Sequence, residues 1–403
     1  MKIAILHYTS WPEIGGVENV AHDQAALLTR MGHEVLLISG KGKDPDDGYA
    51  FVTPEQLDPE YPLHLAVRKV LDNGQADQNF NKYRAELTDL LRPMFAEADV
   101  TIVHNIFTMH FNLPLTLALH DLSKEFRLIA WTHDIVKGEG SDYSLPNPDK
   151  PPWNLMSMAA ANVPYVTASD QRRNELEATL KPVPEVTVVP NVIDLGRLFD
   201  LSLEMRESLD ALALGEREFV FLLPAKLLVR KNVEFAIEAI ERLKDQGRMP
   251  LLLITAPDDS HTPSVQYAQF LRESLSPKLK RYVVFVNEFF PVKQKMLVDL
   301  YQLADCLFFP SKQEGFGLPL LEAALFRLPI ICRPVPAFWS TQGEGCFTLE
   351  SMDQLDDAIN WLESQPTFRL QRLVRRQFDG RYLYRKFYEP LLESVAAAPG
   401  VPK

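Results

Sequence analysis

Met1-Lys-Ile-Ala-Ile-Leu-His-Tyr8, read together with the residues that follow it up to Ser39, decides the fold class. The apolar run from Ile3 to His7 predicts a buried strand. Glu18 to Arg30 carries alanine and leucine at helical spacing and predicts an amphipathic helix, and Glu34 to Ser39 is strand-like again. A strand, a helix and a second strand of this kind form a β-α-β unit, in which both strands lie parallel in one sheet.

Short apolar runs and amphipathic stretches alternate along the whole chain, which is typical of parallel sheets covered by helices on both faces. Further strands are predicted at 100–104, 127–131, 165–168 and 186–189, and a second series at 219–224, 251–255, 282–286, 306–310 and 329–332. Residues 190–200 contain Pro, Asn and Asp and form a compact linker between the two series. The sequence therefore predicts an α/β protein with two doubly wound Rossmann-like domains, 1–195 and 196–378, facing a central ligand cleft.

The bulk properties agree with a folded chain of two domains. Its 403 residues exceed the size at which a single hydrophobic core stops growing, and 46% of them are hydrophobic and 24% charged. The net charge of −12 disfavours nucleic acid or an anionic membrane as a partner. The three cysteines lack metal-type spacing, and no apolar run suits a signal peptide or a membrane span, so we expect reduced thiols and a cytoplasmic protein.

Glu314-Gly-Phe-Gly-Leu-Pro-Leu-Leu-Glu322 is the most informative motif for function. Gly315 and Gly317 permit backbone geometries closed to other residues, and Pro319 suits the first turn of a helix. The motif therefore predicts a loop that enters a helix, whose unpaired N–H groups can face an anion. The two carboxylates lie on the loop and one turn into the helix, so they can touch different parts of one extended ligand. A nucleotide sugar has that shape.

This motif resembles the E-x7-E signature of retaining, nucleotide-sugar-dependent glycosyltransferases of the GT-B fold, family 4. Four other segments agree with that family in their order along the chain: Gly15-Gly16-Val17-Glu18, Thr132-His133-Asp134, Pro190-Asn191-Val192-Ile193-Asp194, and Lys226 through Lys231-Asn232. The resemblance covers roughly residues 1–390. It implies transfer of a hexose from a nucleoside diphosphate to a soluble acceptor, and a C-terminal helix at 379–397 that packs back on the first domain.

Positive charge is needed where a diphosphate departs, because negative charge builds on it as the glycosidic bond lengthens. Lys226 and Lys231 flank a predicted strand-to-helix turn and can supply this charge. The family usually has Arg at the first of these positions, and Lys gives up the planar fork, for which the adjacent Arg230 can compensate. Two solvated lysines at a helix start remain the alternative. The amides of Gly15 and Gly16 can approach the diphosphate closely, although a Gly-Gly pair is a simple turn in most proteins.

The resemblance implies that His133 and Glu314 bind the donor sugar and that Glu322 binds the ribose. The predicted catalytic residues are His133, Lys226, Lys231 and Glu314; the predicted donor-binding residues are Gly15, Gly16, Asp134, Arg230, Gly315, Phe316, Gly317, Leu318 and Glu322. A structural histidine and ordinary helix-start acids are the corresponding alternatives. Asp44-Pro-Asp46 matches a D-x-D metal motif formally but lies in a charged loop, so we expect no metal and no other cofactor.

Some features leave the interpretation open. Asn287 to Pro291 falls where the family reads the nucleobase and has no carboxylate clearly placed for guanine, which favours UDP over GDP. The loop 137–153 either contacts the acceptor, a sugar or other small molecule, or is a surface excursion; the basic stretch 369–386 either binds anions or packs in the structure. Other readings of the whole chain are a sugar-nucleotide epimerase or phosphorylase, a glycoside hydrolase using Glu314 and Glu322, and a silent nucleotide-sugar-binding protein.

Overall fold

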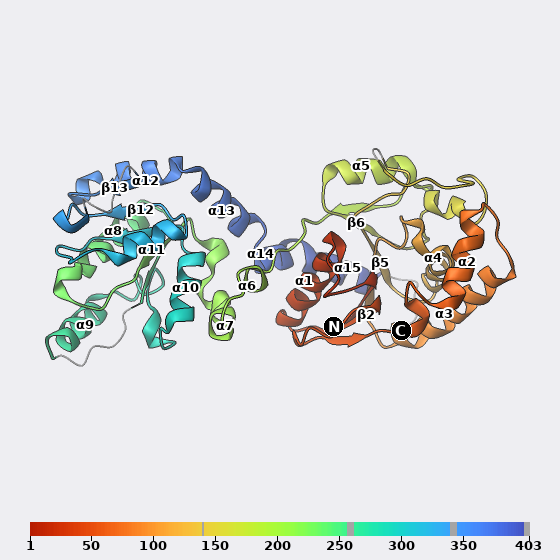
Figure 1. The fold of residues 1–403 in the computed structure, drawn as a ribbon, viewed down its shortest axis with the longest axis horizontal. Helices are drawn as coiled ribbons and strands as arrows, with labels where there is room; N and C mark the ends of the chain where they lie inside the picture. The colour runs from red at the N-terminus through yellow and green to blue at the C-terminus, as the bar shows by residue number, and fades with distance from the viewer. Residues whose placement is uncertain (139–140, 256–261, 339–344, 399–403) are drawn as a thin grey trace. The chain divides into compact units, whose positions relative to one another are not determined.

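The chain forms two compact α/β units, seen in a computed structural model that describes residues 1–138, 141–255, 262–338 and 345–398 (Figure 1). Unit 1 comprises Met1–Ile193 and Gly380–Lys403, and unit 2 comprises Asp194–Asp379. Each unit is built on one sheet of parallel strands. Over the described part of the chain, no helix combines the length and the apolar composition needed to cross a membrane.

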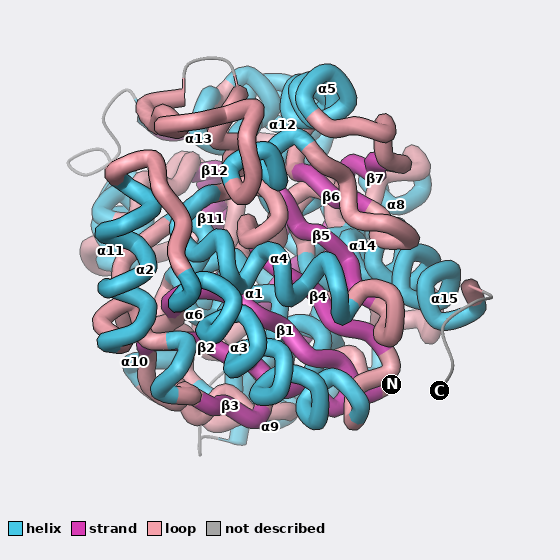
Figure 2. Tube along the Cα trace, turned by 90° about the vertical axis from the view of Figure 1, so that its right-hand side faces the viewer, coloured by secondary structure: helices cyan, strands magenta, loops and turns pink. Residues whose placement is uncertain are grey.

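Unit 1 has a seven-stranded sheet with the order β3-β2-β1-β4-β5-β6-β7. The strands are β1 (Lys2–Thr9), β2 (Glu34–Lys41), β3 (Ala50–Val52), β4 (Val100–His104), β5 (Leu128–Thr132), β6 (Tyr165–Thr167) and β7 (Val186–Val188). Figure 2, in which strands are magenta, shows β1, β4, β5 and β6 running side by side. The order reverses at β1, which pairs with β2 on one side and with β4 on the other. Ligands in doubly wound sheets bind at such a switch point, beyond the carboxyl ends of the strands.

Helices cover both faces of this sheet. They are α1 (Gly16–Arg30), α2 (Pro62–Asp72), α3 (Gln78–Ala96), α4 (Leu113–Leu122) and α5 (Asp170–Thr179). Ile3 and Ile5 of β1 pack into the core that includes α1, whereas Ala4 and Leu6 pack into the core that includes α3 and α4. Because alternate side chains enter two different cores, the whole strand is apolar and its sequence shows no alternation.

The C-terminal segment belongs to unit 1 and packs beside α1 (Figure 1). It consists of α14 (Gly380–Leu383), a π-helical turn (Tyr384–Tyr388) and α15 (Glu389–Ala397). Tyr388 is fully buried, and its ring centre lies 5.2 Å from that of Trp131. The Tyr384 hydroxyl is hydrogen-bonded to Nε2 of His33 at 2.7 Å. These contacts attach the end of the chain to the core that α1 shares with the sheet.

Unit 2 has a six-stranded sheet with the order β10-β9-β8-β11-β12-β13. The strands are β8 (Phe219–Leu223), β9 (Pro250–Ile254), β10 (Val283–Phe285), β11 (Cys306–Phe309), β12 (Ile330–Cys332) and β13 (Cys346–Thr348). The helices are α6 (Leu195–Leu198), α7 (Leu203–Leu212), α8 (Val233–Asp245), α9 (Thr262–Ser274), α10 (Gln294–Leu303), α11 (Leu318–Leu325), α12 (Leu355–Ser364) and α13 (Pro366–Gln377). Here the order reverses at β8, which pairs with β9 and β11.

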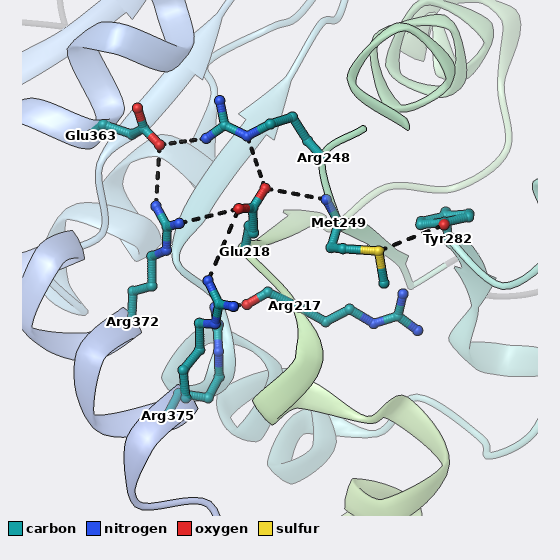
Figure 3. A network of polar contacts seen from close by, with 9 residues as sticks. Arg217, Glu218, Arg248, Met249, Tyr282, Glu363, Arg372 and Arg375 are labelled. Atoms are coloured by element: carbon teal, nitrogen blue, oxygen red, sulfur yellow. Dashed lines mark hydrogen bonds and ion pairs between the residues drawn. The ribbon is translucent and has the colours of Figure 1, made fainter. Parts of the chain in front are cut away.

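An ion-pair network joins α13 to the amino-terminal end of this sheet (Figure 3). Glu218, just before β8, accepts a hydrogen bond from Nε of Arg248 at 2.8 Å and pairs with Arg372 of α13 at 3.4 Å. Arg375 of α13 pairs with Asp305 at 2.6 Å, and both side chains are buried. The arginines of α13 thus form ion pairs within unit 2. For this part of the basic stretch 369–386, a role in packing is therefore favoured over a role in anion binding.

The predicted fold class is confirmed, because both units are Rossmann-like α/β sheets of parallel strands. The predicted strands lie where the structure has them, to within a residue or two. Strands β3 and β13 were not predicted.

Candidate active site

Unit 2 has a pocket of about 420 Å³ at the carboxyl ends of its strands, where the loop after β8 meets α11. Its charged lining residues are Lys226, Arg230, Lys231, Lys293 and Glu322. Four of these five side chains are cationic, so the pocket is suited to a ligand with several negative charges, such as a diphosphate. The cations predicted for a phosphate and the acid predicted for a ribose therefore share one crevice.

Lys231 is the most enclosed of these cations. It ends the short turn before α8, it is buried, and its Nζ forms an ion pair with Oε1 of Glu314 and lies 5.0 Å from the centre of the Phe309 ring. Nη1 of Arg230 lies 3.4 Å from the other oxygen of Glu314. The acid predicted to bind the sugar is thus held by two of the predicted cations, while Lys226 lies exposed in the lining of the pocket.

Asn232 fixes the loop that carries these cations, and the sequence motif did not single out its role. Its backbone adopts the left-handed conformation, with φ of +55°, and its buried side chain donates to the carbonyl of Pro310 at 3.1 Å. Asn tolerates this conformation better than most residues. The loop after β8 is therefore tied to the residue after β11, on the neighbouring strand.

The two glycines of the 314–322 motif differ in the structure. Gly317 caps α11 with φ of +90°, as expected of a residue that must be glycine. Gly315 has no left-handed backbone, and a Cβ atom there would meet nothing within 4 Å. The backbone therefore uses the permitted left-handed geometry at Gly317 and does not use it at Gly315. The flanking side chains of Phe316 and Leu318 are more than half exposed.

Glu322 lies in the second turn of α11 and has a partner that the sequence did not reveal. Its Oε2 accepts a hydrogen bond from the hydroxyl of Tyr301 at 2.7 Å. Burial raises the pKa of Tyr301, and the bond to Glu322 raises it further, so the phenol stays protonated and donates. The sequence of α10 does not indicate that Tyr301 bonds to Glu322, because this contact depends on how α10 packs against α11.

Unit 1 has two adjoining pockets near the carboxyl ends of β1 and β4. One, of about 300 Å³, is lined by His7, Thr9, Glu18, Asn105 and Asp134 among others. The other, of about 420 Å³, is lined by His110 and Trp153 and includes Ser144 and Pro146 of the loop 137–153. Both pockets are lined by His64, Arg68, Phe111 and Asn112. The loop 137–153 therefore forms part of a pocket wall.

Gly15 and Gly16 begin α1 beside the smaller pocket of unit 1. A Cβ atom on Gly15 would come within 1.9 Å of Oε2 of Glu18, whereas a Cβ on Gly16 would meet nothing within 4 Å. Glu18 also accepts a hydrogen bond from Thr9 at 2.6 Å and lies 3.7 Å from Nε2 of His7. The bond with His7 and the bond from Thr9 outweigh burial and lower the pKa of Glu18 to about 2, so this carboxylate is ionised.

His133 follows β5 and lies beside a histidine at the end of β4. Its Nε2 is 3.0 Å from Nδ1 of His104. The amides of His133 and Asp134 donate to Oδ1 of Asn105 at 2.8 and 3.0 Å, and Nδ2 of Asn105 donates to Asp134 at 3.0 Å. Burial, with a smaller contribution from His7, lowers the pKa of His133 to about 4, so the ring is neutral at pH 7.

His104 and Asn105 were not among the predicted site residues, although a signal for them exists. They end or directly follow the predicted strand 100–104, and in a parallel sheet the carboxyl ends of neighbouring strands meet at one edge. Asn105 also has a left-handed backbone, with φ of +60°. The structure thus brings together His133, Asp134 and the Gly15 segment in unit 1, and Lys226, Arg230, Lys231, Glu314 and Glu322 in unit 2.

Comparisons with known proteins agree with this arrangement. Residues 14–197 match the family model described as Glycosyltransferase Family 4, and residues 204–376 match the one described as Glycosyl transferases group 1. Mannosylglucosylglycerate synthase of Thermotoga maritima is 25% identical in an alignment 405 positions long that covers 89% of this chain and 89% of that protein. N-acetyl-alpha-D-glucosaminyl L-malate synthase of Bacillus anthracis is 21% identical, over 82% of this chain and 78% of that protein.

A solved sucrose-phosphate synthase from Thermosynechococcus elongatus is 15% identical and covers 98% of this chain and 100% of its own, with a TM-score of 0.39. The family of this chain is assigned from its two parallel sheets and from the two family models, which together span most of the chain. They define a glycosyltransferase of the GT-B fold. More narrowly, the chain belongs to glycosyltransferase family 4, and its C-terminal half is of the group 1 type.

Proposed function

We propose that this enzyme is a retaining hexosyltransferase, which transfers a hexose from a nucleoside diphosphate to a soluble small-molecule acceptor without a divalent metal. The observation that carries the proposal is the pocket of unit 2, whose charged lining consists of one acid, Glu322, and four cations: Lys226, Arg230, Lys231 and Lys293. Cations held in this way stabilise the charge that develops on a departing diphosphate, the task for which some enzymes use a metal ion.

The proposal gives each group in unit 2 a distinct role. Lys226 and Lys231 bind the diphosphate, and Arg230 supplies the planar fork that Lys226 lacks. Glu322, held by Tyr301, accepts hydrogen bonds from the ribose hydroxyls. Glu314 accepts hydrogen bonds from the sugar, and the amides of residues 316–318 face the sugar and the phosphate.

In unit 1 the proposal assigns His133 and Asp134 to hydroxyl groups of the transferred sugar, and the amides of Gly15 and Gly16 to the diphosphate. The neutral imidazole of His133 fits a hydrogen-bonding role better than that of an acid. Retention then proceeds on one face of the sugar, with the leaving phosphate taking the proton of the acceptor. Because Glu314 is already ion-paired with Lys231 and Arg230, it is poorly suited to act as a covalent nucleophile.

The adjoining pockets of unit 1 are the proposed acceptor site. Arg68 lines both of them, and Phe111, which also lines both, offers apolar surface on which a sugar ring can stack. The names of two relatives indicate products built on glycerate and malate, which are small hydroxy acids. We therefore propose that the acceptor is a small hydroxy acid or a glycoside of one, with its carboxylate near Arg68.

The test is release of nucleoside diphosphate from UDP-glucose, GDP-mannose and UDP-N-acetylglucosamine, each with and without a panel of hydroxy acids and their glycosides. We expect release that depends on the acceptor, persists in EDTA, and yields a product whose anomeric configuration, measured by NMR, matches the donor. Release that is equally fast without any acceptor would indicate hydrolysis, and binding of donor without turnover would indicate a silent binding protein.

Two variants separate the donor from the acceptor in the same assay. Glu322→Gln is expected to raise the KM for the donor and leave that for the acceptor nearly unchanged. Arg68→Ala is expected to raise the KM for the acceptor about 10- to 100-fold, since hydrogen bonds to charged groups contribute about 1.5–3 kcal/mol. Within the part of the chain that the structure describes, Arg68 makes only a distant, exposed ion pair with Asp72, at 3.9 Å, so its loss should cost little stability. If Arg68→Ala moved only the KM for the donor, the proposed acceptor site would be wrong.

A further inference from the structure

We propose that Gln24 and Tyr388 act through His104 to fix the tautomer of His133, so that Nδ1 of His133 accepts a hydrogen bond from a hydroxyl of the donor sugar. The identity of the ligand rests on the proposed function, but the fixed tautomer does not. Gln24 and Tyr388 are positioning residues in this scheme, since they act on the substrate only through the two histidines.

A continuous chain of hydrogen bonds joins the C-terminal turn to the candidate site. Nε2 of Gln24, in α1, donates to the hydroxyl of Tyr388 at 3.4 Å. Oε1 of the same amide lies 2.9 Å from Nε2 of His104, and Nδ1 of His104 lies 3.0 Å from Nε2 of His133. The side chains of Gln24, His104 and Tyr388 are completely buried, so water cannot replace any of these partners.

The two imidazoles are aligned for a directional bond. Their planes are only 9° apart, and their ring centres are 5.3 Å apart. With the two nitrogens 3.0 Å apart, the rings therefore meet edge to edge, and the lone pair of one nitrogen points along the N–H of the other. This geometry requires one of the two nitrogens to carry a hydrogen and the other to be bare.

The orientation of the Gln24 amide decides which nitrogen carries the hydrogen. An amide oxygen only accepts, so the hydrogen of His104 resides on Nε2. Burial lowers the pKa of His104 well below its usual value, which keeps this ring neutral and leaves its Nδ1 bare. His133 must then donate from Nε2, and because it is also neutral, its own Nδ1 keeps a lone pair.

That lone pair is available to a ligand. Within the described residues, Nδ1 of His133 has no hydrogen-bond partner. A sugar hydroxyl can donate to it, whereas a protonated imidazole could only donate in return. If the Gln24 amide were rotated by half a turn, every hydrogen in the chain would be reversed and His133 would present an N–H instead. The two arrangements predict different outcomes for one set of experiments.

The first experiment is a long-range ¹H–¹⁵N correlation spectrum of protein labelled with ¹⁵N-histidine at pH 7.5, assigned with His133→Gln and His104→Gln. We expect Nδ1 of His133 to resonate as a bare nitrogen and Nε2 as a protonated one. Gln24→Leu should shift both signals toward the average of the two tautomers. Tyr388→Phe should produce a smaller shift in the same direction. This variant provides the test if Gln24→Leu does not fold.

Tyr384→Phe is the matched control, because Tyr384 lies on the same turn and bonds to His33 outside the chain of hydrogen bonds. It should leave the His133 signals unchanged. A protonated Nδ1 on His133 in the unaltered protein, or His133 signals that do not respond to Gln24→Leu, would overturn the proposal. Since this readout needs no turnover, it stands even if the proposed function fails.

The second experiment asks what His133 does to the donor, with each monodeoxy and each deoxyfluoro analogue of the accepted sugar. Fluorine cannot donate a hydrogen bond, so at the position that contacts His133 both analogues should bind about tenfold more weakly than the parent donor, as measured by Kd. His133→Gln should remove the difference between that hydroxyl and its replacements. A deoxyfluoro donor that clearly outperforms the deoxy donor at the position sensitive to His133 would show that His133 donates, and would overturn the assignment.

Discussion

The polar groups of the two units are held in opposite ways. In unit 2, Lys231 and Arg230 are ion-paired with Glu314 at the edge of a cationic pocket. In unit 1, His104 and His133 form neutral hydrogen bonds, and Asn105 holds the backbone of the loop that follows β5. Unit 2 therefore presents positive charge to a ligand, whereas His104, His133 and Asn105 of unit 1 are hydrogen-bond donors and acceptors held in fixed positions.

The difference follows from the partners of the buried groups. Desolvation penalises a charged imidazole, and so lowers the pKa of both His104 and His133. Lys231 is also buried, but it has a carboxylate partner and a ring face that offset the cost of removing its charge from water. Lys231 and His133 are thus both buried, but their partners differ. Lys231 keeps a charge that suits a diphosphate, and His133 stays neutral and suits a sugar hydroxyl.

Removing the charge in unit 2 is the strongest way to test this contrast. Lys231→Ala is expected to lower kcat by a factor of about 100–1000, equivalent to roughly 3–4 kcal/mol, if Lys231 stabilises the departing diphosphate. The variant should also lose about 2 kcal/mol of stability, because among the described residues Glu314 then keeps only Arg230 as an ion-pair partner. Steady-state kinetics and urea unfolding measure the two effects.

Lys226→Ala is the matched control for Lys231→Ala. Lys226 lines the same pocket but is exposed, so its loss should lower turnover with little effect on stability. An unchanged kcat for Lys231→Ala would remove Lys231 from the leaving-group role and leave it as a structural partner of Glu314.

Lowering the pH should decrease the stability of unit 1, because its buried histidines are neutral in the folded protein. The pKa of His133 is about 4 in the folded protein, against an ordinary value of 6.5, so between these values the unfolded chain binds more protons. Stability therefore falls as the pH drops from 6.5 toward 4, with a contribution from His133 of at most about 3 kcal/mol. Hydrogen exchange of peptides from β4 and β5, followed from pH 7.5 to 4.5, measures this loss.

His133→Gln is the control, since it removes one titrating group and should reduce the pH dependence of those peptides, while His104, whose pKa burial also lowers, should maintain part of it. Glu18, whose pKa is lowered to about 2, contributes stability that is lost only below pH 4.5, so the two effects occupy different pH ranges. Peptides of β4 and β5 that exchanged at the same rate at pH 6.5 and pH 4.5, after correction for intrinsic exchange, would contradict the neutral state of His133.

Residues that follow a predicted strand could be read from the sequence. His133 and Lys226 both come directly after apolar runs, and doubly wound sheets bind ligands at the carboxyl ends of strands. The same rule applies to His104 and Asn105, which the sequence motifs did not identify as site residues. For these residues, the order of amino acids along one strand contains the necessary information.

Contacts between distant elements could not be predicted in this way. Gln24 meets His104 only because α1 packs over β4, and Tyr388 meets Gln24 only because the C-terminal turn lies beside α1. No spacing within one segment encodes such a contact. Gly315 shows another limit of the sequence, since a glycine permits a left-handed backbone but does not reveal whether the chain adopts one.

The smallest expected effect concerns one of these unpredicted contacts. Tyr301→Phe removes the hydroxyl that donates to Glu322 at 2.7 Å and leaves the ring stacked on Phe326. One hydrogen bond contributes about 1 kcal/mol, so the KM for the donor should rise about fivefold with kcat unchanged. If the bond only orients Glu322 for the ribose, Tyr301→Phe should add little to Glu322→Gln in a double-mutant cycle. Fully additive effects would mean that Tyr301 supports α11 rather than the carboxylate, and that unit 2, unlike unit 1, holds its ligand-binding groups without a fixed neutral donor.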